Sequence, residues 1–240
     1  MTKREKLILL PGMLCDARLF GPQIDALSGT HDIEVMGIDS AESINALADQ
    51  VLARAPERFN LAGLSMGGIV AMAIAGKAPE RVLRLALFDT NHHADAPGRD
   101  QIRNRQIEAV RDGRMRQVVV DEMKPVYLAQ INQSDQALLD LLIDMAMDLG
   151  PEVFIRQSVA LRDRPDQTAA LKAYRGHALV LCGAEDNLCP VERHREMAAL
   201  LDHSVLRIIE NAGHISTLEN AAAVNAALRQ WLDTPLPEPA

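Results

Sequence analysis

Short apolar runs recur along the chain, and each is bounded by turn residues. Residues 7–10 and 179–182 show no alternation of apolar and polar positions. Strands with this pattern are buried on both faces, as in a parallel sheet covered by helices. The predicted strands are residues 7–10, 33–38, 59–63, 82–88, 178–182 and 205–209. We therefore expect an α/β fold with a mostly parallel central sheet of about six strands flanked by helices.

Between these runs, apolar residues recur at helical spacing and predict helices at residues 43–55, 66–78, 191–201 and 219–232. Residues 219–232 carry a single apolar stripe, which is typical of a helix that covers a sheet. Residues 66–78 are apolar on nearly every side, which is typical of a buried helix.

The alternation of strands and helices stops between about residues 92 and 173, where only helical patterns occur. A block of this length between two strands is too long for a plain loop. We expect one domain, residues 1–240, in which residues 92–173 form a helical cap inserted after the strand that ends near Asp89.

Composition and charge exclude several classes of protein. The 33 acidic residues outnumber the 25 basic ones, and aromatic residues make up 3% of the chain, which argues against nucleic-acid binding. No apolar run is long enough to span a membrane, and residues 7–10 are too few for a secretory leader. The three cysteines, Cys15, Cys182 and Cys189, suit a reducing compartment. We expect a cytoplasmic protein with no nucleic-acid or membrane partner.

The clearest chemical signal is Gly63-x-Ser65-x-Gly67, which follows a predicted strand and precedes the predicted buried helix. Small residues two positions before and after the serine allow a very tight turn that leaves its Oγ exposed. A glycine-rich turn with a helix-capping serine is the alternative. The strand–turn–helix context favours a nucleophile.

On these residues the chain resembles the α/β-hydrolase superfamily, over about residues 7–232. The resemblance implies a serine hydrolase with the chain order Ser, Asp, His. His214, in the loop after the last predicted strand, matches the histidine, and Asp186 matches the acid. Asp89, at the end of the preceding strand, is the second candidate for the acid.

An oxyanion hole needs two N–H donors. The resemblance implies that one is Met66, directly after the serine, and that the other lies in the loop after the first strand. Many members carry His-Gly in that loop, whereas this chain has Pro11-Gly12. We expect the N–H of Met13 to be the second donor.

The side chains expected to face the site are aliphatic or sulfur-bearing, and the scarcity of aromatic residues favours a pocket of this kind. Leu14, Met123 and Met145 are the predicted pocket residues. Cys15 is expected to be a small buried filler rather than a nucleophile.

Six arginines occur between Arg99 and Arg116. Such a run is usually the solvated face of a helix. The alternative is attraction of an acyl donor that carries a carboxylate or a phosphate, such as a coenzyme A thioester. His92-His93-x-Asp95 imitates a metal site, but a hinge of the cap is the better interpretation, and no metal or other cofactor is expected.

The predicted activity is hydrolysis of a small carboxylic ester, or a thioester, through a Ser-His-Asp triad and an acyl-enzyme. The superfamily also contains C–C bond hydrolases, lactonases and perhydrolases, and the sequence does not separate these from an esterase. A ligand-binding receptor built on the same fold is the alternative from another class. The expected partner is a small acyl substrate, and the sequence carries no signal for an oligomeric state.

Overall fold

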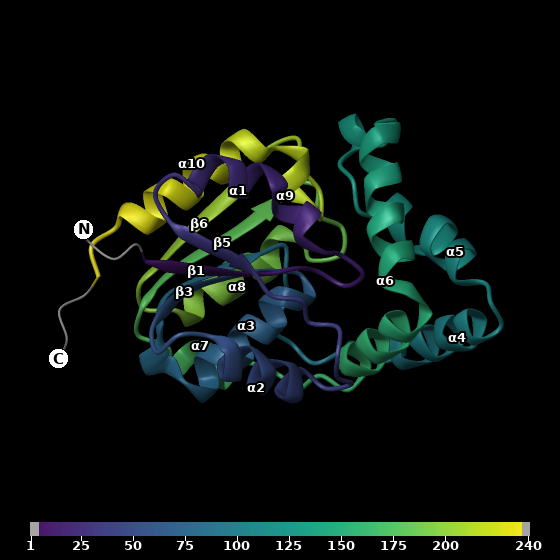
Figure 1. Cartoon of the computed structure of the whole chain (residues 1–240), viewed down its shortest axis with the longest axis horizontal. Helices are drawn as coiled ribbons and strands as arrows, with labels where there is room; N and C mark the ends of the chain where they lie inside the picture. Colours follow the sequence, from purple (N-terminus) through teal and green to yellow (C-terminus); the bar gives the residue numbers. More distant parts are fainter. Residues whose placement is uncertain (1–4, 237–240) are drawn as a thin grey trace.

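A computed structural model describes residues 5–236, and a six-stranded sheet forms its centre (Figure 1). The strands lie in the order β2-β1-β3-β4-β5-β6, and every neighbouring pair is parallel. The predicted α/β fold is therefore confirmed. The strands are β1 (Lys6–Leu10), β2 (Asp32–Val35), β3 (Phe59–Leu64), β4 (Val82–Phe88), β5 (His177–Gly183) and β6 (Ser204–Ile209).

Strand β2 is shorter than the predicted strand at residues 33–38. Beyond Val35 one more hydrogen bond joins the chain to the sheet, from Met36 N to the Leu9 carbonyl (3.0 Å). Met36 and Ile38 are buried although they lie outside the strand. These two residues are apolar because they are buried. The sequence pattern therefore predicted a strand that continues beyond the end of β2.

Helices cover both faces of the sheet (Figure 1). On one face, α3 (Met66–Lys77) packs between α2 (Ile44–Arg54) and α7 (Thr168–Ala173), and α8 (Val191–Leu200) lies beside α7. The other face carries α1 (Gly21–Leu27), α9 (Ser216–Glu219) and α10 (Ala221–Asp233). Residues 66–75 of α3 are all buried, as its uniformly apolar sequence predicts.

The predicted helix at residues 219–232 corresponds to α10, which begins two residues later at Ala221, and the first predicted residue, Glu219, is the last residue of α9. The φ of −138° and ψ of 63° at Asn220 are not helical, and its side chain accepts a hydrogen bond from Ala223 N (3.3 Å). Asparagine is a preferred residue at this capping position. The break at Asn220 therefore separates α9 from α10.

Between β4 and β5 the described chain has helical segments and loops. The segments are α4 (Arg99–Arg111), α5 (Met115–Gln117), η3 (Val118–Met123), η4 (Lys124–Val126), η5 (Gln130–Asn132), α6 (Gln136–Arg162) and α7. Helices α4, α5 and α6 lie beyond one end of the sheet, whereas α7 packs against α3 and α8 (Figure 1). We use the word cap for the chain from α4 to α6. The predicted cap boundary at residue 173 thus includes α7, which lies in the helical layer of the sheet.

Among the described residues, no helix is both long and apolar enough to cross a membrane.

Candidate active site

Ser65 lies at the turn between β3 and α3. Its φ of 53° and ψ of −115° are strained for a residue with a side chain. Two hydrogen bonds hold this turn, from Ser65 N to the Phe88 carbonyl (2.9 Å) and from Thr90 Oγ1 to the Ser65 carbonyl (2.7 Å). A Cβ on Gly63 would collide with the backbone of α3, and a Cβ on Gly67 would collide with the backbone at the end of β1. Glycine on both sides of the serine is therefore a requirement of the turn.

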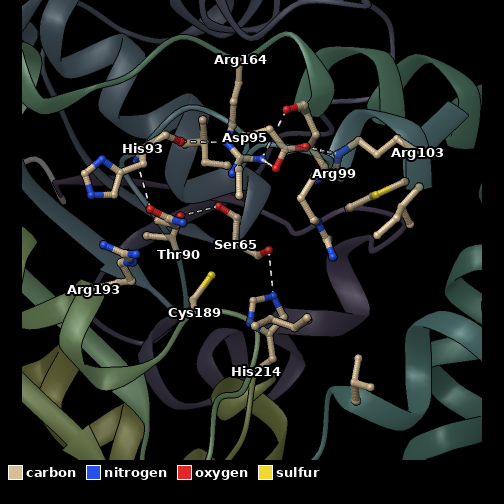
Figure 2. Close-up of a pocket in the computed structure, with 18 of the residues that line it drawn as sticks. Ser65, Thr90, His93, Asp95, Arg99, Arg103, Arg164, Cys189, Arg193 and His214 are labelled. Atoms are coloured by element: carbon tan, nitrogen blue, oxygen red, sulfur yellow. Dashed lines mark hydrogen bonds and ion pairs between the residues drawn. The ribbon is translucent and has the colours of Figure 1, made fainter.

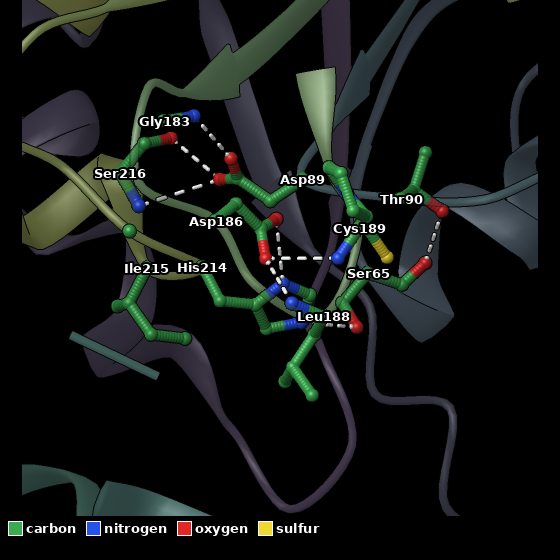
Figure 3. A network of polar contacts seen from close by, with 12 residues as sticks. Ser65, Asp89, Thr90, Gly183, Asp186, Leu188, Cys189, His214, Ile215 and Ser216 are labelled. Carbon is green, nitrogen blue, oxygen red and sulfur yellow. Dashed lines mark hydrogen bonds and ion pairs between the residues drawn. The ribbon is translucent and has the colours of Figure 1, made fainter. Parts of the chain in front are cut away.

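Ser65, His214 and Asp186 are hydrogen-bonded in series (Figure 3). The Ser65 Oγ is 2.9 Å from His214 Nε2, and His214 Nδ1 is 2.9 Å from Asp186 Oδ2. The second carboxylate oxygen, Asp186 Oδ1, accepts from the backbone N–H groups of Leu188 (2.8 Å) and Cys189 (2.9 Å). An ionised carboxylate can only accept, so the proton of a neutral His214 lies on Nδ1. Its Nε2 is then free to accept the hydroxyl proton of Ser65.

His214 and Asp186 are both buried, and each shifts the pKa of the other. Burial lowers the pKa of the His214 imidazole, but the charge and hydrogen bond of Asp186, together with the charge of Asp89, outweigh it, so the net pKa is raised. Burial raises the pKa of Asp186, yet the charge of His214 and three hydrogen bonds outweigh it and lower the pKa overall. The pair therefore favours an ionised Asp186 beside an imidazole that binds its proton more tightly than usual.

Asp89, the second candidate for the acid, faces other groups (Figure 3). Its Oδ1 accepts from Gly183 N (2.8 Å), and its Oδ2 accepts from the N–H and the hydroxyl of Ser216. Burial, followed by the nearby charge of Asp186, raises the pKa of Asp89 well above its usual range. Asp89 thus joins the ends of β4 and β5 to the start of α9, and Asp186 is the carboxylate that contacts His214.

Two groups hold the loop that carries His214. His214 N donates to the Tyr127 carbonyl of the cap (2.6 Å). The Glu219 carboxylate accepts from Gly213 N (2.8 Å) on the histidine loop and from Ala129 N (2.7 Å) on the cap. The position of the imidazole is therefore coupled to the cap as well as to the sheet.

The loop after β1 approaches the serine turn. A Cβ on Gly12 would lie 3.5 Å from the Ser65 Cβ, so this loop and the turn are in contact. Met13 borders the same cavity as Ser65, and Met66 is the first residue of α3. Within residues 5–236, no hydrogen bond uses the backbone N–H of Met13 or of Met66. Both donors predicted for the oxyanion hole are therefore free to bind a ligand oxygen.

Gln157 of α6 braces the loop after β1. Its Oε1 accepts from Leu14 N (2.8 Å), and its Nε2 donates to the Ile38 carbonyl (3.0 Å). Gln157 is 1% exposed, and Leu14 has an unfavourable φ of 54°. The amide thus fixes the residue next to Met13, in a loop that lacks the His-Gly pair of many superfamily members.

A cavity of about 1050 Å³ opens beside Ser65 and His214, between the sheet and the cap (Figure 2). Its apolar lining includes Met13, Ile69, Ile102, Met123, Leu161 and Leu188. Five arginines also line it, namely Arg99, Arg103, Arg105, Arg164 and Arg193. The expectation of a pocket formed by methionine and leucine is corrected by these arginines.

Of the three predicted pocket residues, only Met123 borders the cavity. Leu14 and Met145 are fully buried and lie away from it. Helical and loop patterns identify which side chains are buried, but they do not tell whether a buried face packs on protein or borders a cavity. Leu14 and Met145 belong to the packed interior.

The cysteines are poor nucleophiles in this environment. Cys189 borders the cavity, but burial, followed by the charge of Asp186, raises the pKa of its thiol well above the usual range. Burial also raises the pKa of Cys15, as expected of a small filler. Ser65 is therefore the residue at this site with an adjacent base.

Two groups of potential metal ligands occur in the described residues, namely His92 with His93 and Glu196, and Asp186 with Cys189 and His214. In the first group, His93 Nδ1 contacts Asp166 (3.0 Å) and His93 Nε2 contacts Glu196 (3.2 Å). The second group overlaps the hydrogen-bonded series. His214 and Asp186 of the second group, and both ring nitrogens of His93, therefore have hydrogen-bond partners among the protein's own side chains, whereas the buried His92 Nδ1 has none within the described residues.

Sequence reasoning missed Gln157, Glu219 and the ion pairs of Asp95 with Arg103 and Arg164. A signal existed for Gln157, since it interrupts the apolar stripe formed by Val153, Phe154, Ala160 and Leu161. A polar residue on such a stripe is buried and must find a partner. For Glu219 the sequence holds no comparable signal, because its partners lie on two distant loops.

Comparison with known proteins gives a family and distant relatives. A model of the alpha/beta hydrolase family matches residues 9–227. A dihydrolipoyllysine-residue acetyltransferase component of the acetoin cleaving system from Pseudomonas putida is 27% identical over 195 residues, covering 80% of this chain and 49% of that protein. The chain thus spans about half the length of this relative.

An esterase is found among the curated relatives and among the solved structures. A pimeloyl-[acyl-carrier protein] methyl ester esterase from Neisseria meningitidis is 25% identical over 207 residues, covering 82% of this chain and 64% of that protein. A thermophilic esterase from Thermogutta terrifontis, solved with malate bound, superposes with a TM-score of 0.86 at 27% identity, covering 95% of this chain and 89% of that one.

Proposed function

Because the chain belongs to the alpha/beta hydrolase family, we propose that it hydrolyses a small carboxylic ester through an acyl-enzyme intermediate. The observation that carries the proposal is the hydrogen-bonded series from Asp186 through His214 to Ser65, whose serine borders the cavity. The esterase relative and the esterase structure support an ester as the bond that is cleaved. A thioester would react by the same steps.

In the first step, Ser65 Oγ attacks the acyl carbon while its proton moves to His214 Nε2. Asp186 holds the Nδ1 proton of the imidazole and stabilises the cation that forms. The same proton then moves from Nε2 to the leaving alkoxide, so the alcohol departs and the acyl group remains on Ser65.

In the second step, water gives a proton to His214 Nε2 and attacks the acyl carbon of the acyl-enzyme. The same proton then moves from Nε2 to Ser65 Oγ as the bond to the acyl group breaks, which releases the acid and restores Ser65. The N–H groups of Met13 and Met66 stabilise the negative oxygen in both steps. Gln157 acts through Leu14, since it fixes the loop that presents Met13.

A panel of para-nitrophenyl esters of rising acyl length tests this proposal. Wild-type protein should show steady turnover on at least one ester, and Ser65→Ala should lower kcat by about 10³-fold or more. Ser134→Ala, which removes an exposed hydroxyl on the surface, is the matched control and should retain full activity.

Two outcomes would overturn the proposal. Folded wild-type protein that turns over no ester in the panel is not an esterase. A burst of one product equivalent without further turnover would identify a binding protein on this fold.

A further inference from the structure

The charged groups around the cavity are unequally matched. Five arginines border it, against Asp95, Glu122 and Asp166. Arg193 pairs with Glu196 (2.9 Å), and Arg105 lies 3.5 Å from Glu122. Arg99 has no carboxylate partner within residues 5–236. Figure 2 shows its guanidinium pointing into the cavity on the side of Ser65 and His214.

Behind Arg99, two arginines share one acid. Asp95 Oδ2 contacts Arg103 Nε (2.6 Å), and Asp95 Oδ1 contacts Arg164 Nη1 (3.1 Å). The three side chains are 8–11% exposed. Two cations with one anion leave an excess of one positive charge in a poorly solvated wall. Arg99, which is solvent-exposed and borders the same cavity, adds a second.

These cations affect one another. Burial lowers the pKa of Arg164, the charge of Asp95 opposes this change, and the charges of Arg103 and Arg99 add to it. A guanidinium in such a position is stabilised when an anion binds beside it. The cavity is therefore built to receive negative charge from a ligand.

The remaining arginines of this stretch provide a contrast. Arg111 is exposed and pairs with Glu108 on its own helix (2.7 Å), and Arg114 pairs with Asp112 (3.1 Å). These arginines are solvated outside the cavity. The basic stretch in the sequence therefore has two parts: Arg99, Arg103 and Arg105 border the cavity, and Arg111 and Arg114 lie outside it. Of the three that border the cavity, Arg99 is exposed and has no carboxylate partner among the described residues.

We propose that Arg99, supported by the cluster of Asp95, Arg103 and Arg164, binds a carboxylate in the acyl portion of the substrate. The acyl portion remains in the cavity through both steps, whereas the alcohol leaves after the first, so a charged anchor acts longest on the acyl side. The preferred substrate is then a monoester of a dicarboxylic acid. The term substrate rests on the proposed esterase function, whereas binding of an anion at Arg99 can be tested without turnover.

The first experiment compares para-nitrophenyl hydrogen glutarate with para-nitrophenyl methyl glutarate, which has the same acyl chain without the charge. Wild-type kcat/KM should favour the anionic ester by about tenfold or more. Arg99→Gln should lower this preference by about tenfold or more, chiefly through KM. Arg111→Gln removes the same charge from the same helix outside the cavity and should preserve the preference.

The second experiment uses Ser65→Ala and calorimetric titration with glutarate and, separately, with inorganic phosphate. Glutarate should bind, and binding should be lost in the variant that also carries Arg99→Gln. If glutarate binds in this way but no ester is turned over, the anion site stands and the esterase function fails. Turnover without preference for the anionic ester, a preference unchanged by Arg99→Gln, or Arg99-dependent binding of phosphate alone would overturn the carboxylate site.

Discussion

The two walls of the cavity are built differently. On the sheet side, Ser65, His214 and Asp186 follow strand ends and satisfy one another through hydrogen bonds. On the cap side, Arg99 faces the cavity with no carboxylate partner among the described residues, and two buried arginines share Asp95. Buried polar groups normally have partners, and buried charges are normally balanced. The side chains of the sheet wall thus pair with one another, whereas the cap wall keeps an excess of positive charge. Under the proposed function, the sheet wall would carry out the chemistry and the cap wall would select the substrate.

The largest effect is expected for Asp186→Asn, which should lower kcat about 10³- to 10⁴-fold, because the imidazole loses the group that fixes its tautomer and stabilises its cation. Asp89→Asn should lower kcat less than about tenfold. Asp89 contacts Gly183 and Ser216 rather than His214, and asparagine preserves its size and its acceptor for Gly183. The measurement is kcat on the best para-nitrophenyl ester, with thermal unfolding to check the fold. A large loss in Asp89→Asn instead would transfer the role of the acid to that residue.

The next effect concerns the stability of the cap wall. Asp95→Ala should lower the free energy of unfolding by about 3 kcal/mol, because Arg103 and Arg164 remain buried without a counter-charge. Asp100→Ala removes an exposed carboxylate from the first turn of α4 and is the control. Urea unfolding measures both. Equal small changes in the two variants would show that water already balances the arginines, and the contrast between the walls would disappear.

A smaller effect is expected for Gln157→Met, which removes the brace between the cap and the loop after β1. The kcat should fall about ten- to hundredfold, because Leu14 loses its partner and Met13 N–H moves from its position. Gln136→Met, at the exposed start of the same helix, should leave kcat unchanged. If kcat survives in Gln157→Met while stability falls, the brace serves folding alone.

The sequence predicted those parts of the molecule whose structure is determined by residues close to one another in the sequence. β4 was predicted to the residue, because its apolar run is bounded at both ends. The three groups in series were also predicted, because each follows its own strand in a recognisable local pattern. Gln157 was missed because its partner Leu14 lies 143 residues away. Arg103 lies on the buried face of α4 with Ile107 and Val110. Its burial depends on the ion pair with Asp95, which precedes the helix, so the pattern of the helix alone did not predict it. Pocket walls depend on how a cap helix is turned toward the sheet, which periodicity along one helix does not determine.

The last prediction separates the two walls by pH. Because the net effect of burial and Asp186 raises the pKa of His214, the imidazole keeps its proton above pH 6.5, and kcat/KM should reach half its maximum above that pH. Asp186→Asn removes the larger of the two causes that oppose burial, the other being the charge of Asp89, so the pKa of the imidazole should fall below its wild-type value. Arg99→Gln, on the cap wall, should not move the titration of His214. Nitrogen NMR of the His214 ring measures this pKa in all three proteins, whatever their activity. A wild-type value below 6.5 would mean that burial dominates, and Asp186 would then lose its role as the group that stabilises the imidazolium.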